Sequence, residues 1–523
     1  MAEPFYITTA INYPNGRPHI GHAYEGIATD VMARFQRLMG RDVRFVTGTD
    51  EHGLKMDQTA RNMGRETIDL ANEMSGHFRD MADKLNLSYD EFVRTTEPRH
   101  HAASIELWKR MEANGDLYLD RYEGWYSVRD EAFYDESELG EGEGGEKLSP
   151  QGTPVEWTAE ETWFFRLSNY QEKLLALYRD NPEFIRPESR RNEVMRFVEG
   201  GLKDLSVSRT SFDWGVPVPD SDGHVMYVWV DALTTYMTGV GFPDANGEMF
   251  QRYWPANIHM IGKDIVRFHT VYWPAFLMSA NLPLPEQVFG HGFLLARGGE
   301  KMSKSAGNVV DPMALAEQFG VDNLRYFFMR EIAFGQDGSY SPEAIVARAN
   351  AELANSFGNL AQRTLSMIAK NMDGKLETFE PAEADTDLLQ TVKSACEVKL
   401  PEAFEKLAFS VGIEDWIKAV YACNQYVDEQ APWTLRKTDP ERMKVVLQTL
   451  FMAIRDLAIA IQPVVPEKAA LLLEQIGISE DERGYGNLSD DAWYDRLVEA
   501  GFAVGKPTPI FPRLELPEEE SAA

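Results

Sequence analysis

The N-terminal part of the chain alternates between short apolar runs and a longer amphipathic segment. Phe5–Ile11 and Val43–Thr47 are apolar and contain β-branched residues, as buried strands do. Between them, Gly21–Met39 has the apolar spacing of a helix, and Gly40 ends it. Strand, crossover helix and strand form a right-handed βαβ unit, so this pattern predicts a parallel sheet.

The α/β pattern stops and later resumes. Helical segments continue to about Asn114, and strands are expected again at Val225–Val230, Ile258–Ile261 and Val288–Gly290, with a helix after Asp264. The pattern predicts one α/β domain whose two halves are separated by an insertion.

The insertion has an unusual composition. Asp130–Glu161 holds eleven acids and a single base, Lys147, and Gly140–Gly145 reads GEGEGG. Such a stretch is typical of an exposed loop. Helical stretches at about Ser168–Asp180 and Pro187–Lys203 complete the inserted module.

Beyond about Ser341 the pattern is almost wholly helical. Leu353, Phe357, Leu360 and Thr364 recur at i, i+4, i+7 and i+11, which predicts one buried stripe on a helix. The chain therefore combines an α/β part with a C-terminal helical part, and its 523 residues are enough for two to four domains.

Composition narrows the class of protein. Acids outnumber bases 83 to 52, a net charge of −31, which excludes a generally basic nucleic-acid coat protein. The two cysteines, Cys396 and Cys423, cannot build a disulfide framework or a zinc site of three or four thiolates. The N-terminus has no export signal, and the uncharged stretch Thr270–Pro285 is too short to cross a membrane, so we expect a cytoplasmic protein.

Two short motifs carry candidate chemistry. Pro18–His22 reads PHIGH at the first βα turn, where an open α/β sheet binds phosphates. Lys301–Ser305 reads KMSKS among small residues, a cationic loop that could clamp a polyphosphate. Each alone could be ordinary surface, a helix start with two exposed histidines or a solvated basic loop. Together, and in this order, they match the HIGH and KMSKS signatures of class I aminoacyl-tRNA synthetases.

Longer segments point to one branch of that class. The chain resembles methionyl-tRNA synthetase along nearly its whole length. The matching segments are Ala10–Gly16, Gly48–Gly53, Tyr227–Tyr236, Gly262–Trp273, His291–Phe293, Asn359–Arg363 and Asp428–Trp433.

The resemblance implies a methionine pocket. Asp50 and the backbone near Ala10 and Ile11 would hold the amino group, because a carboxylate suits an ammonium. The residues that match the side-chain pocket are Tyr13, Trp229, Ala232, Leu233, Tyr236, Ile265, His269 and Trp273. Aromatic walls favour a polarizable thioether, although each aromatic alone could be ordinary core packing. Leu233 stands where many relatives have proline.

The resemblance also implies an ATP site between the two signatures. His19 and His22 would contact the phosphates, Gly21 would lie under the adenosine, and Asp264 would accept from the ribose hydroxyls. Lys301 and Lys304 would hold the departing pyrophosphate, and His291 and Gly292 match further ATP-binding positions. The methionine carboxylate would attack the α-phosphorus, with Mg²⁺ arriving with the ATP, so catalysis would consist of positioning and charge stabilisation.

A third site is implied in the helical part. Asn359 and Arg363 are one helical turn apart, and Trp433 follows a proline at a helix boundary. In the family this trio recognises the CAU anticodon of methionine tRNA, through base edges and stacking. Without the resemblance, Arg363 would be a surface charge and Trp433 a packing residue.

The insertion departs from the common family pattern. Many members carry a cysteine zinc knuckle there, but residues 117–224 contain no cysteine, so we expect no zinc and no other metal in the protein. The module also looks too short for a hydrolytic editing domain. Arg186–Arg209 holds six bases and four acids, and Arg209 matches a family segment that leads toward the acceptor stem of tRNA. No further C-terminal domain follows the helical part, which favours a monomer.

These observations predict a doubly wound, Rossmann-type α/β catalytic domain with an inserted α+β module and an all-α anticodon-binding bundle. The expected divisions are 1–116, 117–224, 225–292, 293–340 and 341–523. The expected function is methionine activation with ATP, followed by transfer of the methionyl group to tRNA. The alternatives are a catalytically silent tRNA-binding paralogue, or another class I enzyme such as the leucine or cysteine ligase.

Overall fold

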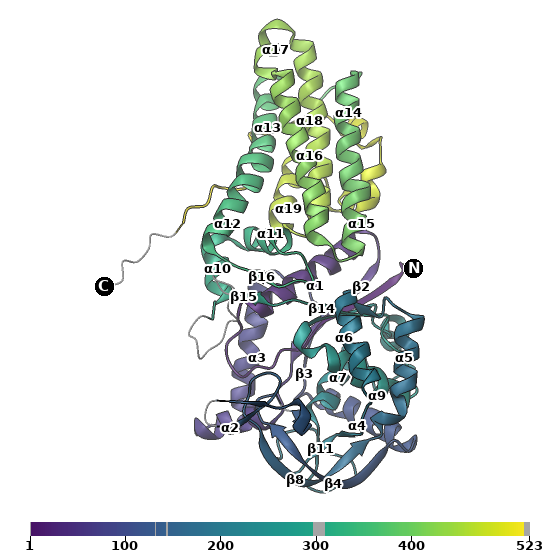
Figure 1. Cartoon of the computed structure of the whole chain (residues 1–523). Coiled ribbons are helices and arrows are strands. Elements are labelled where there is room, and N and C mark those ends of the chain that lie inside the picture. The colour runs from purple at the N-terminus through teal and green to yellow at the C-terminus, as the bar shows by residue number, and fades with distance from the viewer. Residues whose placement is uncertain (1, 131, 143–144, 296–308, 517–523) are drawn as a thin grey trace, which may run out of the picture.

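A computed structural model describes residues 2–130, 132–142, 145–295 and 309–516. Figure 1 shows an elongated molecule with a helical bundle at one end and an α/β body with the insertion at the other. In the described part, no helix is both long enough and apolar enough to cross a membrane.

The α/β body is built on a six-stranded parallel sheet in the order β3-β2-β1-β13-β14-β9. The bounds of its strands, in that order, are Glu91–Arg94, Asp42–Thr49, Pro4–Thr9, Ile258–Gly262, Gln287–His291 and Ile185–Arg186. Helix α1 (Ile20–Leu38) follows β1 directly, and the strand order reverses between β1 and β13. Ligands of such sheets bind outside the carboxyl ends of the strands at this reversal. The predicted parallel-sheet fold is confirmed.

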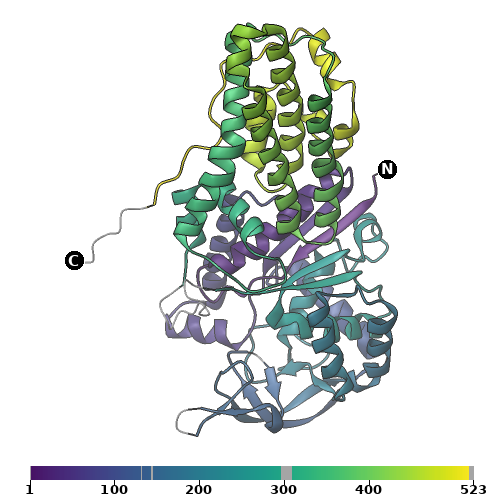
Figure 2. The ribbon, with the colours of Figure 1, turned by 45° about the horizontal axis from the view of Figure 1, so that its top comes forward.

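Side chains alternate between the two faces of β1, as the pleat requires. Phe5 and Ile7 belong to the apolar core that continues into the helical bundle, whereas Tyr6 belongs to a second core shared with α7 and the insertion. In Figure 2, α1 and the N-terminal strands lie between the bundle and the insertion. The N-terminal βαβ unit therefore joins the two cores.

The prediction of a strand at Val225–Val230 is wrong. Strand β12 covers only Val225–Met226, pairs with β11 (Ser208–Arg209), and is followed by helix α7 (Val228–Thr238). Almost every residue of α7 is buried, and a helix buried all round has the same continuous apolar pattern as a buried strand.

Other elements differ from the sequence pattern in smaller ways. The helical segments before Asn114 are α2 (Leu54–Asn62), α3 (Thr67–Lys84) and α4 (Pro98–Ala113), with β3 between the last two. The helix expected after Asp264 is a short 3₁₀ turn, a π-helical segment Phe268–Tyr272 and α9 (Trp273–Ser279). A π-helical segment inside a helix is frequent at functional sites.

The insertion is organised around two long strands that pair antiparallel, β4 (Leu117–Ser127) and β8 (Glu156–Phe165). Among the described residues of the acidic Gly-rich stretch, Gly140, Glu141 and Gly145 are exposed, as expected, but strand β6 (Gly140–Glu141) pairs with β7 (Lys147–Leu148). Helices α5 (Gln171–Asp180) and α6 (Glu188–Glu199) follow, and β9 between them extends the catalytic sheet.

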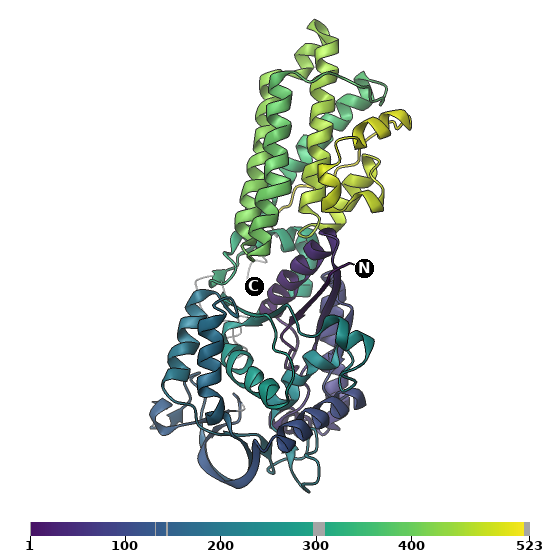
Figure 3. The ribbon, with the colours of Figure 1, turned by 90° about the vertical axis from the view of Figure 1, so that its right-hand side faces the viewer.

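The bundle contains four long helical runs. Helix α12 (Pro342–Arg348) continues through a π-helical segment (Ala349–Gly358) into α13 (Asn359–Asn371), which packs with α14 (Glu383–Lys393), α16 (Phe409–Gln430) and α18 (Pro440–Ile461). The predicted stripe of Leu353, Phe357, Leu360 and Thr364 is buried, so that prediction is confirmed. Figure 3 shows the segments after α19 (Pro466–Gln475) along one side of the bundle.

Candidate active site

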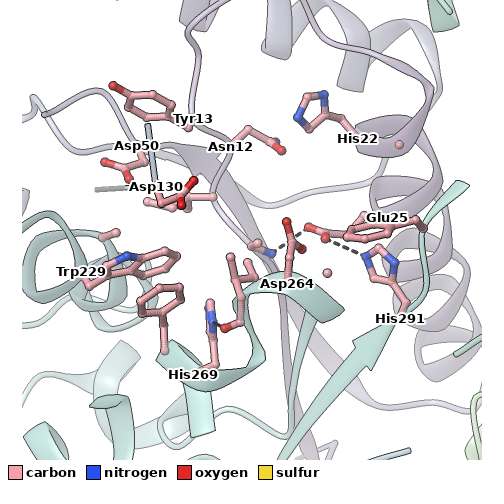
Figure 4. A pocket seen from close by; sticks show the side chains of 18 of the residues that line it. Asn12, Tyr13, His22, Glu25, Asp50, Asp130, Trp229, Asp264, His269 and His291 are labelled. Carbon is pink, nitrogen blue, oxygen red and sulfur yellow. Dashed lines mark hydrogen bonds and ion pairs between the residues drawn. The ribbon is translucent and has the colours of Figure 1, made fainter. Parts of the chain in front are cut away.

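One cavity of about 400 Å³ opens at the carboxyl ends of the central strands. Its walls come from the β1–α1 loop, the first turns of α1, the end of β2, α7, the segment after β13 and the end of β14. Figure 4 shows Asp50 and Trp229 at one end and His22, Glu25 and His291 at the other. The residues implied for the two binding sites thus line opposite ends of one cavity, at the point where the strand order reverses.

This cavity brings together most residues expected from the sequence. Those expected to contact methionine that line it are Ala10, Ile11, Tyr13, Asp50, Trp229, Ala232, Leu233, Tyr236, Ile265 and His269. Those expected to contact ATP that line it are His19, Gly21, His22, Asp264, His291 and Gly292. Residues 296–308, including Lys301 and Lys304, lie outside the described residues.

Two expected residues lie away from the cavity wall. Trp273 is fully buried behind it, where its indole Nε1 donates to His259 Nε2 at 3.4 Å. Arg209 is 2% exposed, and its guanidinium lies over the rings of Tyr126 and Tyr227. This burial argues against a direct contact between Arg209 and tRNA.

The first turn of α1 fixes the two signature histidines. His19 Nδ1 accepts from the backbone N–H of Gly21 at 3.1 Å, and His22 Nδ1 accepts from that of His19 at 3.0 Å. The rings stack with centroids 3.7 Å apart. Because Nδ1 accepts in both, the neutral ring carries its proton on Nε2 and can donate to an anion. A Cβ at Gly21 would lie 3.0 Å from the His19 ring, so glycine permits this arrangement.

Glu25 is a cavity residue that the sequence did not reveal. Its carboxylate accepts from Ala10 N at 2.9 Å and from His291 Nε2 at 2.8 Å. His291 Nδ1 lies 2.8 Å from the Gly292 carbonyl, so both ring nitrogens face acceptors. Burial lowers the pKa of His291, but the hydrogen bond and charge of Glu25 outweigh it, and the pKa is raised overall. A buried, hydrogen-bonded His291–Glu25 pair therefore lies at the end of the cavity formed by the first turns of α1.

Helix α7 supplies the apolar wall of the opposite end. Trp229, Ala232, Leu233 and Tyr236 follow the spacing i, i+3, i+4, i+7 and share one helix face. Trp229 stacks on Phe268, with centroids 3.8 Å apart and planes 6° from parallel. Phe268 lines the cavity, but the sequence reasoning missed it, although it lies inside the matched segment Gly262–Trp273.

His269 is held as a neutral ring in this wall. Its Nδ1 lies 3.0 Å from the Ile265 carbonyl and donates to it, so its Nε2 accepts from the Tyr236 hydroxyl at 2.6 Å. Burial lowers the pKa of His269 to about 4. This end of the cavity therefore presents aromatic and aliphatic surface with a fixed, uncharged polar group.

The ends of β1 and β2 are joined beneath Asp50. Asn12 N donates to the Gly48 carbonyl, and Asp50 N donates to the Asn12 carbonyl, both at 2.9 Å. The Tyr13 hydroxyl accepts from Met56 N at 3.2 Å. The Asp50 carboxylate is buried at the apolar end, where it could receive a cation.

The insertion also reaches the cavity, through Arg129, Asp130 and Gln151. The Asp130 carboxylate accepts from the hydroxyls of Ser149, Thr153 and Tyr134, which fixes the tip of the insertion. The acidic composition of this stretch had suggested only an exposed loop, so these residues were not anticipated.

The third expected cluster lies in the bundle. Asn359 and Arg363 are exposed on α13. Trp433 is the second residue of α17 (Pro432–Thr438), and 44% of its surface is exposed. The Arg363 guanidinium lies 5.3 Å from the centroid of the Trp433 ring. Figure 1 places α17 at the end of the bundle far from the sheet. Such exposure is not that of a core-packing tryptophan.

Similarity to known proteins extends along nearly the whole chain. The family model described as "tRNA synthetases class I (M)" matches residues 5–365, and the "Anticodon binding domain of methionyl tRNA ligase" matches residues 361–522. The chain is 55% identical to the methionine–tRNA ligase of Mycobacterium bovis, covering 99% of both chains, and 56% identical to that of Rhizobium meliloti, also covering 99% of both.

Solved structures give a similar result. The Mycobacterium tuberculosis methionyl-tRNA synthetase in complex with methionyl-adenylate superposes with a TM-score of 0.93 at 54% identity, covering 98% of this chain and 100% of that one. Its apo form gives a TM-score of 0.88 at 51% identity and covers 99% of both chains.

Proposed function

Because the chain belongs to the class I methionyl-tRNA synthetases and is a methionine–tRNA ligase, we propose that its cavity is where methionyl-adenylate forms. The enzyme activates methionine with ATP and transfers the methionyl group to tRNA. The two alternatives, a silent paralogue and another class I enzyme, are disfavoured by the match to methionine–tRNA ligases over the full length.

One observation carries the site assignment. A single cavity is lined at one end by a buried carboxylate and an aromatic wall, and at the other by a helix N-terminus with two histidines. We assign the Asp50 carboxylate to the methionine ammonium, because this buried carboxylate lines the cavity and can accept hydrogen bonds from an ammonium and balance its charge. The thioether then lies against Trp229 and Tyr236, where sulfur–aromatic contacts are favourable.

The ATP end follows from the same geometry. The N-terminus of α1 and the Nε2 protons of His19 and His22 suit the phosphates, and Asp264 suits the ribose hydroxyls. The Glu25 carboxylate raises the pKa of His291, which favours a positive charge there. Mg²⁺ enters with ATP as part of the substrate, and Lys301 and Lys304 are assigned to the pyrophosphate from their sequence alone.

Methionine-dependent pyrophosphate exchange tests this assignment. Methionine should support exchange of labelled pyrophosphate into ATP far better than leucine, isoleucine or cysteine. Ethionine should work in part, because one methylene changes binding to an apolar pocket by only about 1–3 kcal/mol. Equal exchange with leucine would sink the proposal.

We further propose that Asn359, Arg363 and Trp433 recognise the CAU anticodon of methionine tRNA. Their exposure and the Arg363–Trp433 contact support it, because a ring held by a guanidinium is ready to stack on an unpaired base. Replacing CAU in a methionine tRNA should abolish charging and leave exchange unchanged, whereas efficient charging of the altered tRNA would refute the assignment.

We also propose that the enzyme is a cytoplasmic monomer without zinc. Within the described ranges, no group of three or more His, Cys, Asp or Glu side chains is arranged to hold a metal, and both cysteines lie buried in the bundle. Elemental analysis of dialysed protein should find zinc well below one equivalent, and light scattering should give the mass of one chain. One equivalent of zinc would refute the proposal that the enzyme lacks zinc, and the mass of two chains would refute the proposal of a monomer.

A further inference from the structure

A buried carboxylate lies on the side of α7 that faces away from the cavity. Asp231 is 1% exposed and, unlike Trp229, Ala232 and Leu233 beside it, does not line the cavity. At 100° per residue it lies nearly opposite the face that Trp229 and Tyr236 share. Asp231 therefore cannot touch the amino acid and must act through other groups.

Two histidines bind this carboxylate, one to each oxygen. His52 Nδ1 donates to Oδ2 and His100 Nε2 donates to Oδ1, both at 2.6 Å. Both rings are buried, and His100 Nδ1 also lies 2.9 Å from the Thr238 hydroxyl at the far end of α7. Burial works against ionisation, yet the two imidazoles hold the pKa of Asp231 well below its usual range. These are short, charge-assisted hydrogen bonds.

The His52 bond connects α7 to the segment that carries Asp50. Asp50, Glu51 and His52 are consecutive, so His52 is the point at which α7 holds this segment. On the sheet side the same segment is held through Glu51, whose carboxylate accepts from Arg94 at 2.6 and 3.0 Å. The Trp214 indole donates to the Glu51 carbonyl at 2.6 Å. Asp50 is thus directly followed by an anchor to the sheet, at Glu51, and an anchor to α7, at His52.

We propose that Asp231 is a positioning residue which, through His52, sets the separation between Asp50 and the apolar face of α7. That separation is the length available between the ammonium and the end of the methionine side chain. The inference rests on the proposed assignment of Asp50 and α7 to methionine. Asp231 would therefore help to determine which length of amino-acid side chain the pocket accepts, although it contacts no substrate.

An amide cannot replace this carboxylate. Asparagine offers one acceptor oxygen, whereas His52 and His100 both donate to Asp231. One ring would have to change tautomer or lose its partner, so the link between α7 and the Asp50 segment would loosen. A shift of about 1 Å in a positioning group can lower the rate by about 100-fold.

The test compares Asp231→Asn with Asp116→Asn in pyrophosphate exchange. Asp116 is also a buried carboxylate of the α/β body, with Tyr170 and Ser279 as partners, and it does not line the cavity. In Asp231→Asn the KM for methionine should rise about 10- to 100-fold while the KM for ATP stays within about twofold. The ratio of kcat/KM for methionine over ethionine should fall about tenfold. Asp116→Asn should change neither.

Histidine variants keep the proposal testable if Asp231→Asn fails to fold. His52→Gln cuts the link to the Asp50 segment, whereas His100→Gln cuts only the link to α4. The first should reproduce the rise in the KM for methionine, and the second should leave it close to the wild-type value. Equal effects of the two, an equal rise in both KM values, or unchanged kinetics in a folded Asp231→Asn would each overturn the proposal. Wild-type exchange with methionine, measured alongside, tests the proposed function separately.

Discussion

At the scale of single residues, the pKa values of two buried histidines in the cavity wall are shifted in opposite directions for a physical reason. Both rings of His269 and His291 are buried, and burial alone favours the neutral form. His269 has a carbonyl and a hydroxyl as partners, so burial dominates and its pKa is lowered, whereas the hydrogen bond and charge of Glu25 raise the pKa of His291. The pKa values of these histidines therefore depend on their hydrogen-bond partners rather than on residue type alone.

The partners of these histidines could not be predicted from the sequence pattern. Glu25 lies inside a helix and 266 positions from His291, so no local spacing joins them. The sequence pointed to His19, His22, Asp50 and Asp264 because each lies in a short matched motif. Glu25 and Phe268 were identified as cavity residues only from the structure.

The Glu25–His291 pair predicts a pH-dependent loss of stability. The pKa of His291 is raised in the folded protein, so its contribution is fully present below the unfolded pKa of about 6.5 and is lost as pH rises through the folded pKa. Glu25→Gln should therefore lower the free energy of unfolding by about 2 kcal/mol at pH 6 and by much less at pH 9. Thermal midpoints of both proteins at the two pH values measure this.

Asp116→Asn provides the control for that experiment. The pKa of Asp116 is lowered, since its hydroxyl partners outweigh burial, so its contribution is present above the usual pKa of a carboxyl group and is lost only in acid. Its loss of stability should be equal at pH 6 and pH 9. A deficit of Glu25→Gln that did not shrink toward pH 9 would contradict the assignment of charge to His291.

At the scale of elements, the sequence predicted best where a motif or a period-specific pattern exists. The β1–α1–β2 unit begins and ends within a few residues of the expected positions, because its strands and helix have distinct periods. Strands β3 and β9 were missed, since each is short and lies at an edge of the sheet beside helices. Helix α7 was mistaken for a strand because it is buried on almost all sides and begins with the short apolar run Val228–Val230.

One buried arginine joins elements that the sequence left separate. Arg325, in α11 (Val321–Glu331), donates to Asp30 of α1 at 2.6 Å and to the carbonyls of Pro463 and Val464 beyond the end of α18 at 2.8 and 3.0 Å. Both members of the ion pair are fully buried. Helix α1 and the end of α18 are thus fixed to one guanidinium.

Removing this guanidinium should be costly, and removing its partner too should be less so. Arg325→Met leaves the Asp30 carboxylate buried with weaker compensation, and we expect a loss of about 3–5 kcal/mol in the free energy of unfolding. Adding Asp30→Asn should lose less than the sum of the two single changes, because the ion pair is counted in both. Urea unfolding of the three variants measures the coupling.

A surface ion pair supplies the comparison. Arg65 and Glu73 lie 2.7 Å apart and are partly exposed, so Arg65→Met should cost less than about 1 kcal/mol. If the losses at Arg325 and Asp30 were simply additive, their contact would not be what joins α1 to α11.

At the scale of the whole molecule, the cavity and the proposed anticodon-binding residues lie at opposite ends of an acidic chain. A chain with a net charge of −31 cannot bind tRNA through its average field, so recognition must come from local groups. The cavity lies in the α/β body, and Trp433 lies on α17 at the far end of the bundle (Figure 1). The order of these parts along the chain could be predicted from the sequence, but their joint core around the α1 side of the sheet could not, since long-range packing leaves no periodic trace.

This separation predicts that a change at Trp433 affects one reaction and spares the other. Stacking a base on an aromatic ring contributes about 1–3 kcal/mol, so Trp433→Ala should lower kcat/KM for methionine tRNA by about 5- to 150-fold. Methionine-dependent exchange needs no tRNA and should stay near wild type. The matched control is Trp416→Phe, at a fully buried tryptophan whose indole donates to the Leu457 carbonyl, which should lower the thermal midpoint and affect all tRNAs alike. Charging of methionine tRNA and of an anticodon-swapped variant distinguishes the two, and a Trp433→Ala enzyme that still discriminated fully between them would place anticodon recognition elsewhere.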